Sequence, residues 1–266
     1  MEYPLIALLT DFGEGDFFVG SMKGVIARIN PTVRVEDITH HVPSYNIPSG
    51  SFILDASYRY YPPRTIFLVV VDPGVGSSRR ILLAETEDYI FIAPDNGILA
   101  PVLQDKKTRR VVEVTNTRYF LPNPKTTFDG RDKMAPVAAW ISRGEDLEEF
   151  GPEVLDYERI RMQRARVENE SISGQVVYVD KFGNLITNIP VEEAFRLQKT
   201  SGKKGLVCLI KGKKITRFEK SYAFVGRGEL LFIPGSLDLI EIAMREGSAE
   251  KKLAAAPGDA VRIVSG

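Results

Sequence analysis

The sequence predicts an α/β amino-terminal domain with a mainly parallel central sheet, followed by a carboxy-terminal antiparallel β sandwich or barrel. Two apolar runs, residues 5–10 and 66–71, are too short for ordinary helices and are typical of strands buried on both faces of a parallel sheet. Beyond about residue 170, short alternating or apolar segments are separated by Gly, Asn and Lys turns. We therefore place the α/β domain at residues 1–165 and the β domain at residues 166–266.

The first part of the chain has the order of a β-α-β unit. After the strand at residues 5–10, residues 17–29 carry apolar side chains at helical spacing, and an Asn-Pro pair ends the helix. Residues 33–38 are predicted to form a second strand, and residues 48–61 a second helix. A right-handed crossover in such a unit makes its two strands parallel neighbours.

Each of the two buried strands is followed by an aspartate. Asp11 follows the first strand and Asp72 the second, so both carboxylates are expected at the carboxyl edge of the sheet, where open α/β sheets bind ligands. After Asp72 the chain turns through glycines whose backbone can face a small anion or water. Arg79 then lies within reach of Asp72. The alternative is a strand cap with a surface ion pair.

The remainder of the first domain alternates strands, helices and polar turns. Residues 81–84 and 89–93 are predicted to form a hairpin, and a third polar tip, around Asp95, follows it. A helix is expected from residue 98, a strand at residues 111–115 and a helix at residues 133–142. The turn at residues 128–132, FDGRD, suits helix capping and a functional site equally well.

A charged, weakly periodic stretch at residues 147–170 is predicted to connect the two domains. Seven strands are expected after it, at residues 172–179, 185–189, 205–211, 214–218, 230–233, 237–244 and 260–264. Two loops among them, residues 180–184 and 234–236, are candidates for a site, although ordinary turn chemistry explains each equally well.

Composition excludes several classes of function. Lys plus Arg equals Asp plus Glu at 35 each, which gives no electrostatic argument for nucleic acid or an anionic membrane surface. No apolar run is long enough to span a membrane, and the amino terminus lacks the features of a signal peptide. The single cysteine, Cys208, excludes disulfides within the chain, so we expect a cytoplasmic protein.

The two histidines, His40 and His41, are adjacent in a loop and lack further ligands at metal-site spacing, so a hydrogen-bonded loop is favoured over a metal site. The chain also lacks the glycine-rich phosphate loops and the serine-hydrolase elbow motif.

Motif after motif, in order, the chain resembles the S-adenosylmethionine hydrolase (adenosine-forming) family, relatives of fluorinase and chlorinase. The motifs are TDFGEGDFFVGSMKGV, DITHHVP, VVVDPGVGSSRR, APDNGIL, FDGRDKMAPVAA, VDKFGNLITNI and a late PGS. The resemblance implies attack of water or hydroxide on the ribose C5′ of S-adenosylmethionine, giving adenosine and methionine. It implies no cofactor or metal, and a homotrimer with each site between the amino-terminal domain of one subunit and the carboxy-terminal domain of the next.

The resemblance also implies roles for individual residues at the sugar and the methionine. Asp11 would hold the ribose hydroxyls, and Tyr45 would lie near the sugar. Asp180 and Ser236 would bind the ammonium and carboxylate of methionine.

At the adenine, the resemblance implies that Phe182 and Tyr222 sandwich the base and that Asn184 hydrogen-bonds its edge. Aspartates in such a site suit a cationic substrate that carries ribose hydroxyls.

At the water site, Asp72 and Arg79 match two members of the hydrolases' Asp, Arg, His triad, whereas the halogenases carry Tyr at the position of Asp72. The third member is Asp129 here, where the hydrolases have the His of FHGRD. An imidazole can donate or accept a hydrogen bond, whereas an ionised carboxylate only accepts, although it can act as a general base. The missing His would allow a non-catalytic S-adenosylmethionine or adenosine-binding protein as an alternative. A halogenase is a further alternative, against which Asp72 and Arg79 argue.

Overall fold

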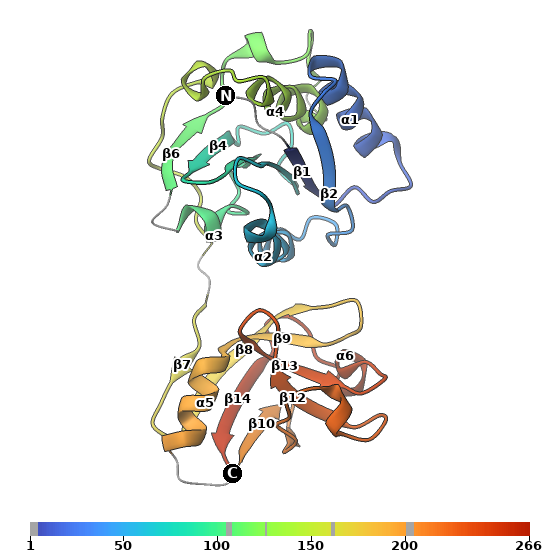
Figure 1. Cartoon of the computed structure of the whole chain (residues 1–266), viewed down its shortest axis with the longest axis vertical. Helices are drawn as coiled ribbons and strands as arrows, with labels where there is room; N and C mark the ends of the chain where they lie inside the picture. The colour runs from blue at the N-terminus through green and yellow to red at the C-terminus, as the bar shows by residue number, and fades with distance from the viewer. Residues whose placement is uncertain (1–4, 105–107, 126, 161–162, 201–204) are drawn as a thin grey trace. The chain divides into compact units, whose positions relative to one another are not determined.

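The computed structural model of the protein describes residues 5–104, 108–125, 127–160, 163–200 and 205–266. The chain divides into two compact units, Met1–Arg161 and Met162–Gly266 (Figure 1). Each unit has its own hydrophobic core, and each is described by itself below.

The first unit is built on a six-stranded sheet in the order β2-β1-β3-β5-β4-β6. Its strands are β1 (Leu5–Thr10), β2 (Arg34–Thr39), β3 (Ile66–Val70), β4 (Ile81–Thr86), β5 (Ile90–Pro94) and β6 (Thr108–Glu113). The pairs β1–β2, β1–β3 and β3–β5 are parallel, and β4 is antiparallel to both of its neighbours. The predicted mainly parallel sheet and the hairpin at its far side are confirmed.

Helices cover both faces of this sheet. The helix α1 (Phe17–Ile29) and the helix α4 (Ala135–Ser142) lie on one face, and the helices α2 (Ile47–Ser57) and α3 (Ala100–Leu103) lie on the other (Figure 1). Successive residues of β3 alternate between the two cores, as side chains of a strand must. This double burial explains why the strands are apolar throughout.

Four single-turn segments also lie in the described part of the first unit. They are η1 (Tyr58–Tyr60), η2 (Thr117–Tyr119), the π-helical turn η3 (Gly130–Met134) and η4 (Leu147–Phe150).

The strand order reverses between β1 and β3. From β1 the chain crosses to β2 at the edge of the sheet, and it then returns to β3 on the other side of β1 before continuing to β4 and β5. Thr10 pairs with Val70, so both strands end at the same level. Such a switch point is where open α/β sheets bind ligands.

Most of the stretch predicted as a connector belongs to the first unit. Phe150 is fully buried there, Glu113 N–H donates to the Pro152 carbonyl at 2.9 Å, and Val154 N–H donates to the Val111 carbonyl at 2.8 Å. The prediction was therefore wrong for residues 147–160, because charged surface residues hid the few apolar contacts that hold this segment.

The second unit is a nearly closed antiparallel β barrel in the order β11-β10-β14-β8-β9-β13-β12, with the short β7 beside β8. Its strands are β7 (Arg166–Val167), β8 (Ser171–Val179), β9 (Leu185–Pro190), β10 (Leu206–Ile210), β11 (Lys213–Ile215), β12 (Leu230–Pro234), β13 (Leu239–Met244) and β14 (Ala260–Ser265). An isolated parallel bridge links Phe218, which follows β11, to Phe232 of β12 and so brings the two ends of this series together. The predicted antiparallel β domain is confirmed.

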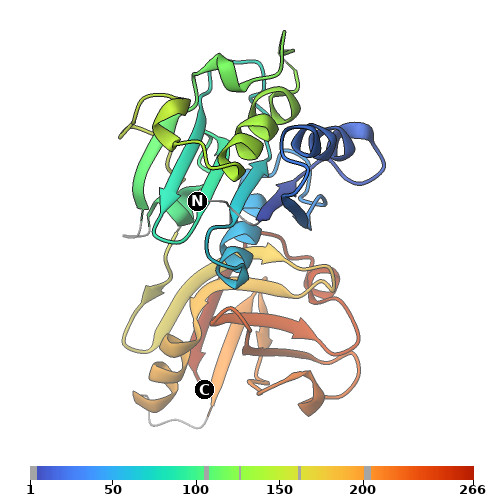
Figure 2. The same cartoon turned by 45° about the horizontal axis from the view of Figure 1, so that its top comes forward.

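Helical segments in the second unit escaped the sequence analysis. They are α5 (Val191–Thr200), η5 (Tyr222–Phe224) and α6 (Ala249–Leu253). Helix α5, orange in Figure 2, packs beside the strands of the barrel. It buries Ala194 and Leu197, and its Glu192, Glu193 and Arg196 form ion pairs at helical spacing.

Candidate active site

Asp72, Arg79 and Asp129 form one buried cluster just beyond the carboxyl end of β3. Arg79 Nε donates to Asp72 Oδ1 at 2.9 Å, and Arg79 Nη2 donates to Asp72 Oδ2 and, at 2.6 Å, to Asp129 Oδ2. The side chains of Asp72, Arg79 and Asp129 are 6%, 10% and 4% exposed. The ion pair is therefore buried, which rules out the alternative of a surface pair.

A tight turn brings Arg79 back to Asp72. Val75 N–H donates to the Asp72 carbonyl at 3.3 Å, and Ser77 N–H donates to the Gly74 carbonyl at 3.1 Å. The Ser77 hydroxyl also donates to that carbonyl, at 2.7 Å, and accepts from Arg79 N–H at 3.2 Å. Because the turn is closed by its own backbone, the bidentate Arg79–Asp72 pair is fixed before any ligand binds.

Asp129 reaches the cluster because the Phe128-Asp129-Gly130 turn packs directly on β3. A side chain on Gly130 would lie 3.3 Å from Val70 Cγ1, so glycine permits this approach. The Phe128 ring packs edge-on against Phe12 and Phe18, with centroids 5.7 and 5.2 Å apart. This packing of the turn places the Asp129 side chain in the cluster.

The other acid of FDGRD has a structural role. Asp132 accepts from Arg131 Nε at 2.5 Å and from Lys125 N–H at 2.7 Å. Burial opposes ionisation of Asp132, but these bonds lower its pKa overall. Neither Asp129 nor Asp132 caps the helix with its side chain, so the capping alternative was wrong: Asp129 joins the cluster, and Asp132 holds Lys125 and Arg131.

The guanidinium of Arg79 is held in its ionised form. Burial alone would lower the pKa of Arg79, but its hydrogen bonds to Asp72 and Asp129, with their charges, raise that pKa above the ordinary value. On the other side of Asp129, Lys133 Nζ lies 2.8 Å from Oδ1 as an ion pair whose geometry is not that of an aligned hydrogen bond. Lys133 was not predicted from the sequence, although residues four positions apart on a helix, such as Asp129 and Lys133, lie side by side.

Asp11 lies on the neighbouring strand end and accepts a hydrogen bond from Tyr45 N–H to Oδ2 at 2.8 Å. Tyr45 adopts a φ of 64° and leaves its side chain 73% exposed. A non-glycine residue in this region is unusual, and here the bond to Asp11 holds it. The structure thus brings Asp11 and Tyr45 together, with the tyrosine ring facing solvent.

The histidines do not form a pair. His40 is buried, with Nδ1 2.9 Å from the Thr10 hydroxyl and Nε2 3.0 Å from Asp37 Oδ1. His41 is exposed and lies 3.5 Å from Glu14. The predicted hydrogen-bonded loop is confirmed, and it ties β1 to the end of β2. Among the described residues, no group of three His, Cys, Asp or Glu is placed to hold a metal ion.

In the second unit, Asp180 organises the loop between β8 and β9. Its Oδ1 accepts from the backbone N–H groups of Phe182 and Asn184 at 2.8 and 2.9 Å, and its Oδ2 accepts from Asn184 Nδ2 at 2.9 Å. Asn184 is buried, whereas the Phe182 ring is 68% exposed. The loop therefore presents one aromatic ring from a rigid base.

Tyr222 lies beside a buried acid that the sequence analysis did not identify. Its hydroxyl donates to Glu241 Oε1 at 2.5 Å, and Glu241 is 9% exposed on β13. Burial and the charge of Asp180 raise the pKa of Glu241, although the Tyr222 bond opposes this. Burial and Glu241 also raise the pKa of Tyr222. In the sequence, Glu241 is simply one residue of the apolar strand LIEIAM.

Ser236 occupies the exposed turn between β12 and β13, which Gly235 N–H closes by donating to the Leu239 carbonyl at 2.9 Å. This turn directly precedes the strand that carries Glu241. Asp180, Phe182, Asn184, Tyr222 and Ser236 thus all lie in the second unit, whereas Asp11, Tyr45 and the buried cluster lie in the first.

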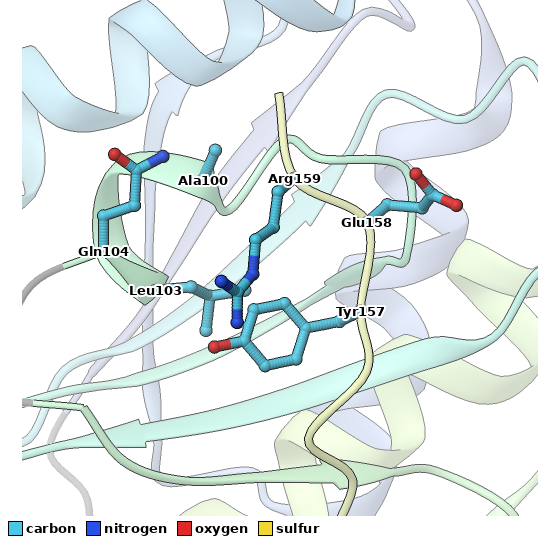
Figure 3. A pocket seen from close by; sticks show the side chains of 6 residues that line it. All are labelled: Ala100, Leu103, Gln104, Tyr157, Glu158 and Arg159. Atoms are coloured by element: carbon cyan, nitrogen blue, oxygen red, sulfur yellow. The ribbon is translucent and has the colours of Figure 1, made fainter. Parts of the chain in front are cut away.

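A separate cavity of about 370 Å³ lies between α3 and residues 157–159 of the first unit (Figure 3). Arg159 extends over the Tyr157 ring, 5.0 Å from its centroid, and Glu158 points away from it. Nearby, Asp95 accepts from Arg80 Nε at 2.9 Å and from Glu158 N–H at 2.8 Å. Asp95, the polar residue predicted after the hairpin, therefore holds residues 157–159 in place. None of the predicted site residues lines the cavity.

Comparison with known proteins identifies the family. The family model described as SAM hydroxide adenosyltransferase N-terminal domain matches residues 6–151, and that of the C-terminal domain matches residues 174–262. The chain belongs to the SAM hydroxide adenosyltransferase family. The resemblance stated from the sequence motifs is thereby confirmed.

The chain is similar over nearly its whole length to two hydrolases, and over a shorter part to a fluorinase. The chain is 33% identical to the (R)-S-adenosyl-L-methionine hydrolase of Salinispora tropica, covering 99% of this chain and 98% of that protein. It is 32% identical to the protein of the same name from Methanocaldococcus jannaschii, with 98% and 95% covered. A fluorinase from Actinopolyspora mzabensis is 30% identical over 70% of this chain and 71% of its own.

Among solved structures, an uncharacterized conserved protein from Thermotoga maritima superposes with a TM-score of 0.90 at 39% identity, covering 97% of this chain and 99% of that one. In the part of the chain that the structure describes, no helix combines the length and apolar character needed to cross a bilayer.

Proposed function

We propose that the protein hydrolyses S-adenosyl-L-methionine at the ribose C5′ to adenosine and L-methionine. The observation that carries this proposal is the buried Asp72–Arg79–Asp129 cluster at the carboxyl end of β3. It is supported by family membership and by the hydrolase names of relatives that match the full chain.

The proposed reaction is a displacement at carbon. The water oxygen forms a bond to C5′ while the C5′–S bond breaks, and its electron pair moves to the sulfonium, which leaves as the neutral thioether of methionine. No acid is needed to protonate this leaving group, and the reaction needs no cofactor. The protein must instead align water, carbon and sulfur, and accept the proton that water loses.

The cluster suits that task. Arg79 fixes the Asp72 carboxylate with two hydrogen bonds and binds Asp129 through one oxygen. Each carboxylate oxygen has two lone pairs, so both aspartates can still accept a bond from water. We assign Asp72 and Arg79 to positioning the water and Asp129 to accepting its proton.

Substrate binding is assigned to both units. Asp11 and Tyr45 would hold the ribose from the first unit. From the second unit, Phe182 and Tyr222 would stack on adenine, with Asn184 at its edge, while Asp180 and Ser236 would bind the methionine end. Aromatic stacking and acids suit a purine attached to a cation.

Because the assigned residues are divided between two units, we propose a homotrimer in which each site draws its two halves from different subunits. A cytoplasmic location fits a chain whose single cysteine, Cys208, is buried in β10.

The test is incubation of the purified protein with S-adenosylmethionine, with adenosine and methionine quantified by chromatography. Both sulfonium epimers should be used, because the relatives' names specify the (R) form. Halide-free and halide-containing buffers separate a hydrolase from a halogenase, and calorimetry separates an enzyme from a binder.

We expect adenosine from the (R) epimer in both buffers, and none from Asp72→Asn. Binding without product would show the non-catalytic alternative instead. A halogenated nucleoside would show a halogenase.

A further inference from the structure

The Asp72–Arg79–Asp129 cluster has more negative than positive charge. Two carboxylates share one guanidinium, and all three side chains are at most 10% exposed. A buried charge without a partner is strongly unfavourable, because little water remains to solvate it. An imidazole at position 129 would avoid the problem, since its neutral form accepts a proton without a buried negative charge. A carboxylate there needs a second cation.

Lys133 supplies this cation from the following helical turn. Its Nζ lies 2.8 Å from Asp129 Oδ1, while Arg79 binds Asp129 Oδ2 at 2.6 Å. Each oxygen of Asp129 therefore faces a different cation, which fixes the plane of the carboxylate. With Lys133 included, the four side chains carry two positive and two negative charges.

Lys133 approaches Asp129 from the solvent side. Its side chain is 29% exposed and lines a cavity of about 320 Å³ together with Ser77, Arg79, Phe120 and Asp129. The ammonium lies 6.0 Å from the centroid of the Phe120 ring. Lys133 thus remains hydrated while it pairs with the carboxylate, and the cavity gives a proton on Asp129 a route to bulk water.

We propose that Lys133 is a positioning residue for hydrolysis, which holds the Asp129 carboxylate in the orientation in which it accepts the proton of the attacking water. This inference rests on the proposed function. It implies that Asp129 and Lys133 work as a unit in place of a single histidine. The proton passes from water to the Asp129 carboxylate and then to solvent in the cavity.

The test compares Lys133→Met, Lys133→Arg and the parent in full-chain protein, with Lys213→Met, an exposed lysine of β11, as the matched control. Lys133 contacts Asp129 and has no assigned contact with the substrate, so Lys133→Met should lower kcat about tenfold and leave KM nearly unchanged. Lys133→Arg, which keeps a cation at this position, and Lys213→Met should keep kcat near the parental value.

A double-mutant cycle tests the route through Asp129. In an Asp129→Asn background, Lys133→Met should change kcat less than about twofold, because no carboxylate remains to position. An unchanged kcat in Lys133→Met, or an undiminished effect of Lys133→Met in the Asp129→Asn background, would overturn the inference.

If the parent protein does not hydrolyse S-adenosylmethionine, the proposed function fails, and melting temperatures then decide on the pairing. If the double variant loses less Tm than the sum of the losses in Asp129→Asn and Lys133→Met, the two residues work as a pair. Additive losses would overturn it.

Discussion

At the scale of single residues, the site depends on two carboxylates sharing one guanidinium. Arg79 has two hydrogen bonds to Asp72 and one to Asp129, so one guanidinium holds both acids. A lysine at position 79 could not provide this fork, since an ammonium lacks the planar, bidentate geometry. Asp72 is thus fixed by the bidentate pair with Arg79, whereas Asp129 also faces Lys133 and the cavity, from which a proton can leave to solvent.

Asp129→Asn tests this division. The amide keeps the volume of the side chain but removes the basic oxygen, so kcat should fall by roughly 10²–10⁴, the usual contribution of a positioned general base. Binding of adenosine, measured by calorimetry, should change little and serves as the control for folding. Asp129→His, which recreates FHGRD, is the complementary variant. Parental turnover in Asp129→Asn would show that Asp129 takes no part in proton transfer.

Glu241 gives a prediction about stability and pH. Its pKa in the folded protein is raised above an ordinary value near 4.5, chiefly by burial. The folded state therefore favours the protonated form of Glu241. The stability that this preference contributes is fully present below the pKa of Glu241 in the unfolded chain, and it is lost as the pH rises through the pKa of Glu241 in the folded protein. Glu241→Gln stays neutral and still accepts from Tyr222, so its Tm relative to the parent should rise with pH.

Scanning calorimetry from pH 4 to pH 8 measures this difference, which should grow from near zero to a few degrees. Glu219→Gln, at a more exposed position, is the control. A Tm difference that stays constant with pH would contradict the effect of burial on Glu241.

At the scale of elements, the loop between β8 and β9 is rigid because hydrogen bonds hold it both internally and to helix α6. Asp180 holds it from within by three hydrogen bonds, and Glu250 N–H of α6 donates to the Gly183 carbonyl at 2.9 Å. The exposed Phe182 ring is thus presented in one position, which reduces the entropy lost when a base stacks on it.

Gly183→Ala should disturb this loop. Gly183 has a φ of 81°, and an added Cβ would lie 2.1 Å from Ser248 Oγ and 2.6 Å from Ser248 Cβ, so the loop would have to leave α6. We expect a lower Tm and weaker adenosine binding. Gly212→Ala is the matched control, because it has a φ of 71° and open space around it. An alanine at a positive φ costs about 1 kcal/mol of backbone strain in either variant, so this cost cancels in the comparison. Equal effects in the two variants would show that the α6 contact is unimportant.

Much of the fold could be predicted because its strands are buried on both faces. Residues 5–10 and 66–70 carry the apolar pattern that such burial requires, and the aspartates after them mark the edge of the sheet. Helix α5 was missed because it buries only Ala194 and Leu197, too few apolar positions to stand out among strands.

Within the site, the Asp72–Arg79 contact could be predicted because it is local, seven residues apart around a glycine turn. The position of Asp129 came from motif resemblance, since fifty-seven residues separate it from Asp72. Glu241 was missed because its strand neighbours are apolar, and only the packing of Tyr222 over it shows its environment. Contacts between distant segments depend on packing that local patterns do not contain.

At the scale of the whole molecule, the assigned residues are divided between two compact units. The proposed proton acceptor and ribose ligands belong to the first, and the proposed adenine and methionine ligands to the second. Neither unit carries the full set, so a separately expressed 1–165 fragment should fold without activity. An active fragment, measured by adenosine release, would show that the first unit is sufficient.

Complementation between two inactive full-chain variants tests whether the halves of one site come from different subunits. Asp72→Asn removes the water site in the first unit, and Phe182→Ala removes the adenine platform in the second. In a ring-shaped trimer, each mixed assembly contains one junction at which both halves are intact, so random exchange of equal amounts should restore about a quarter of parental activity. Each variant alone, after the same unfolding and refolding, is the control. If one subunit supplies both halves of its own site, no mixture can contain an intact site, and the refolded mixture will show only the summed residual activities of the two variants.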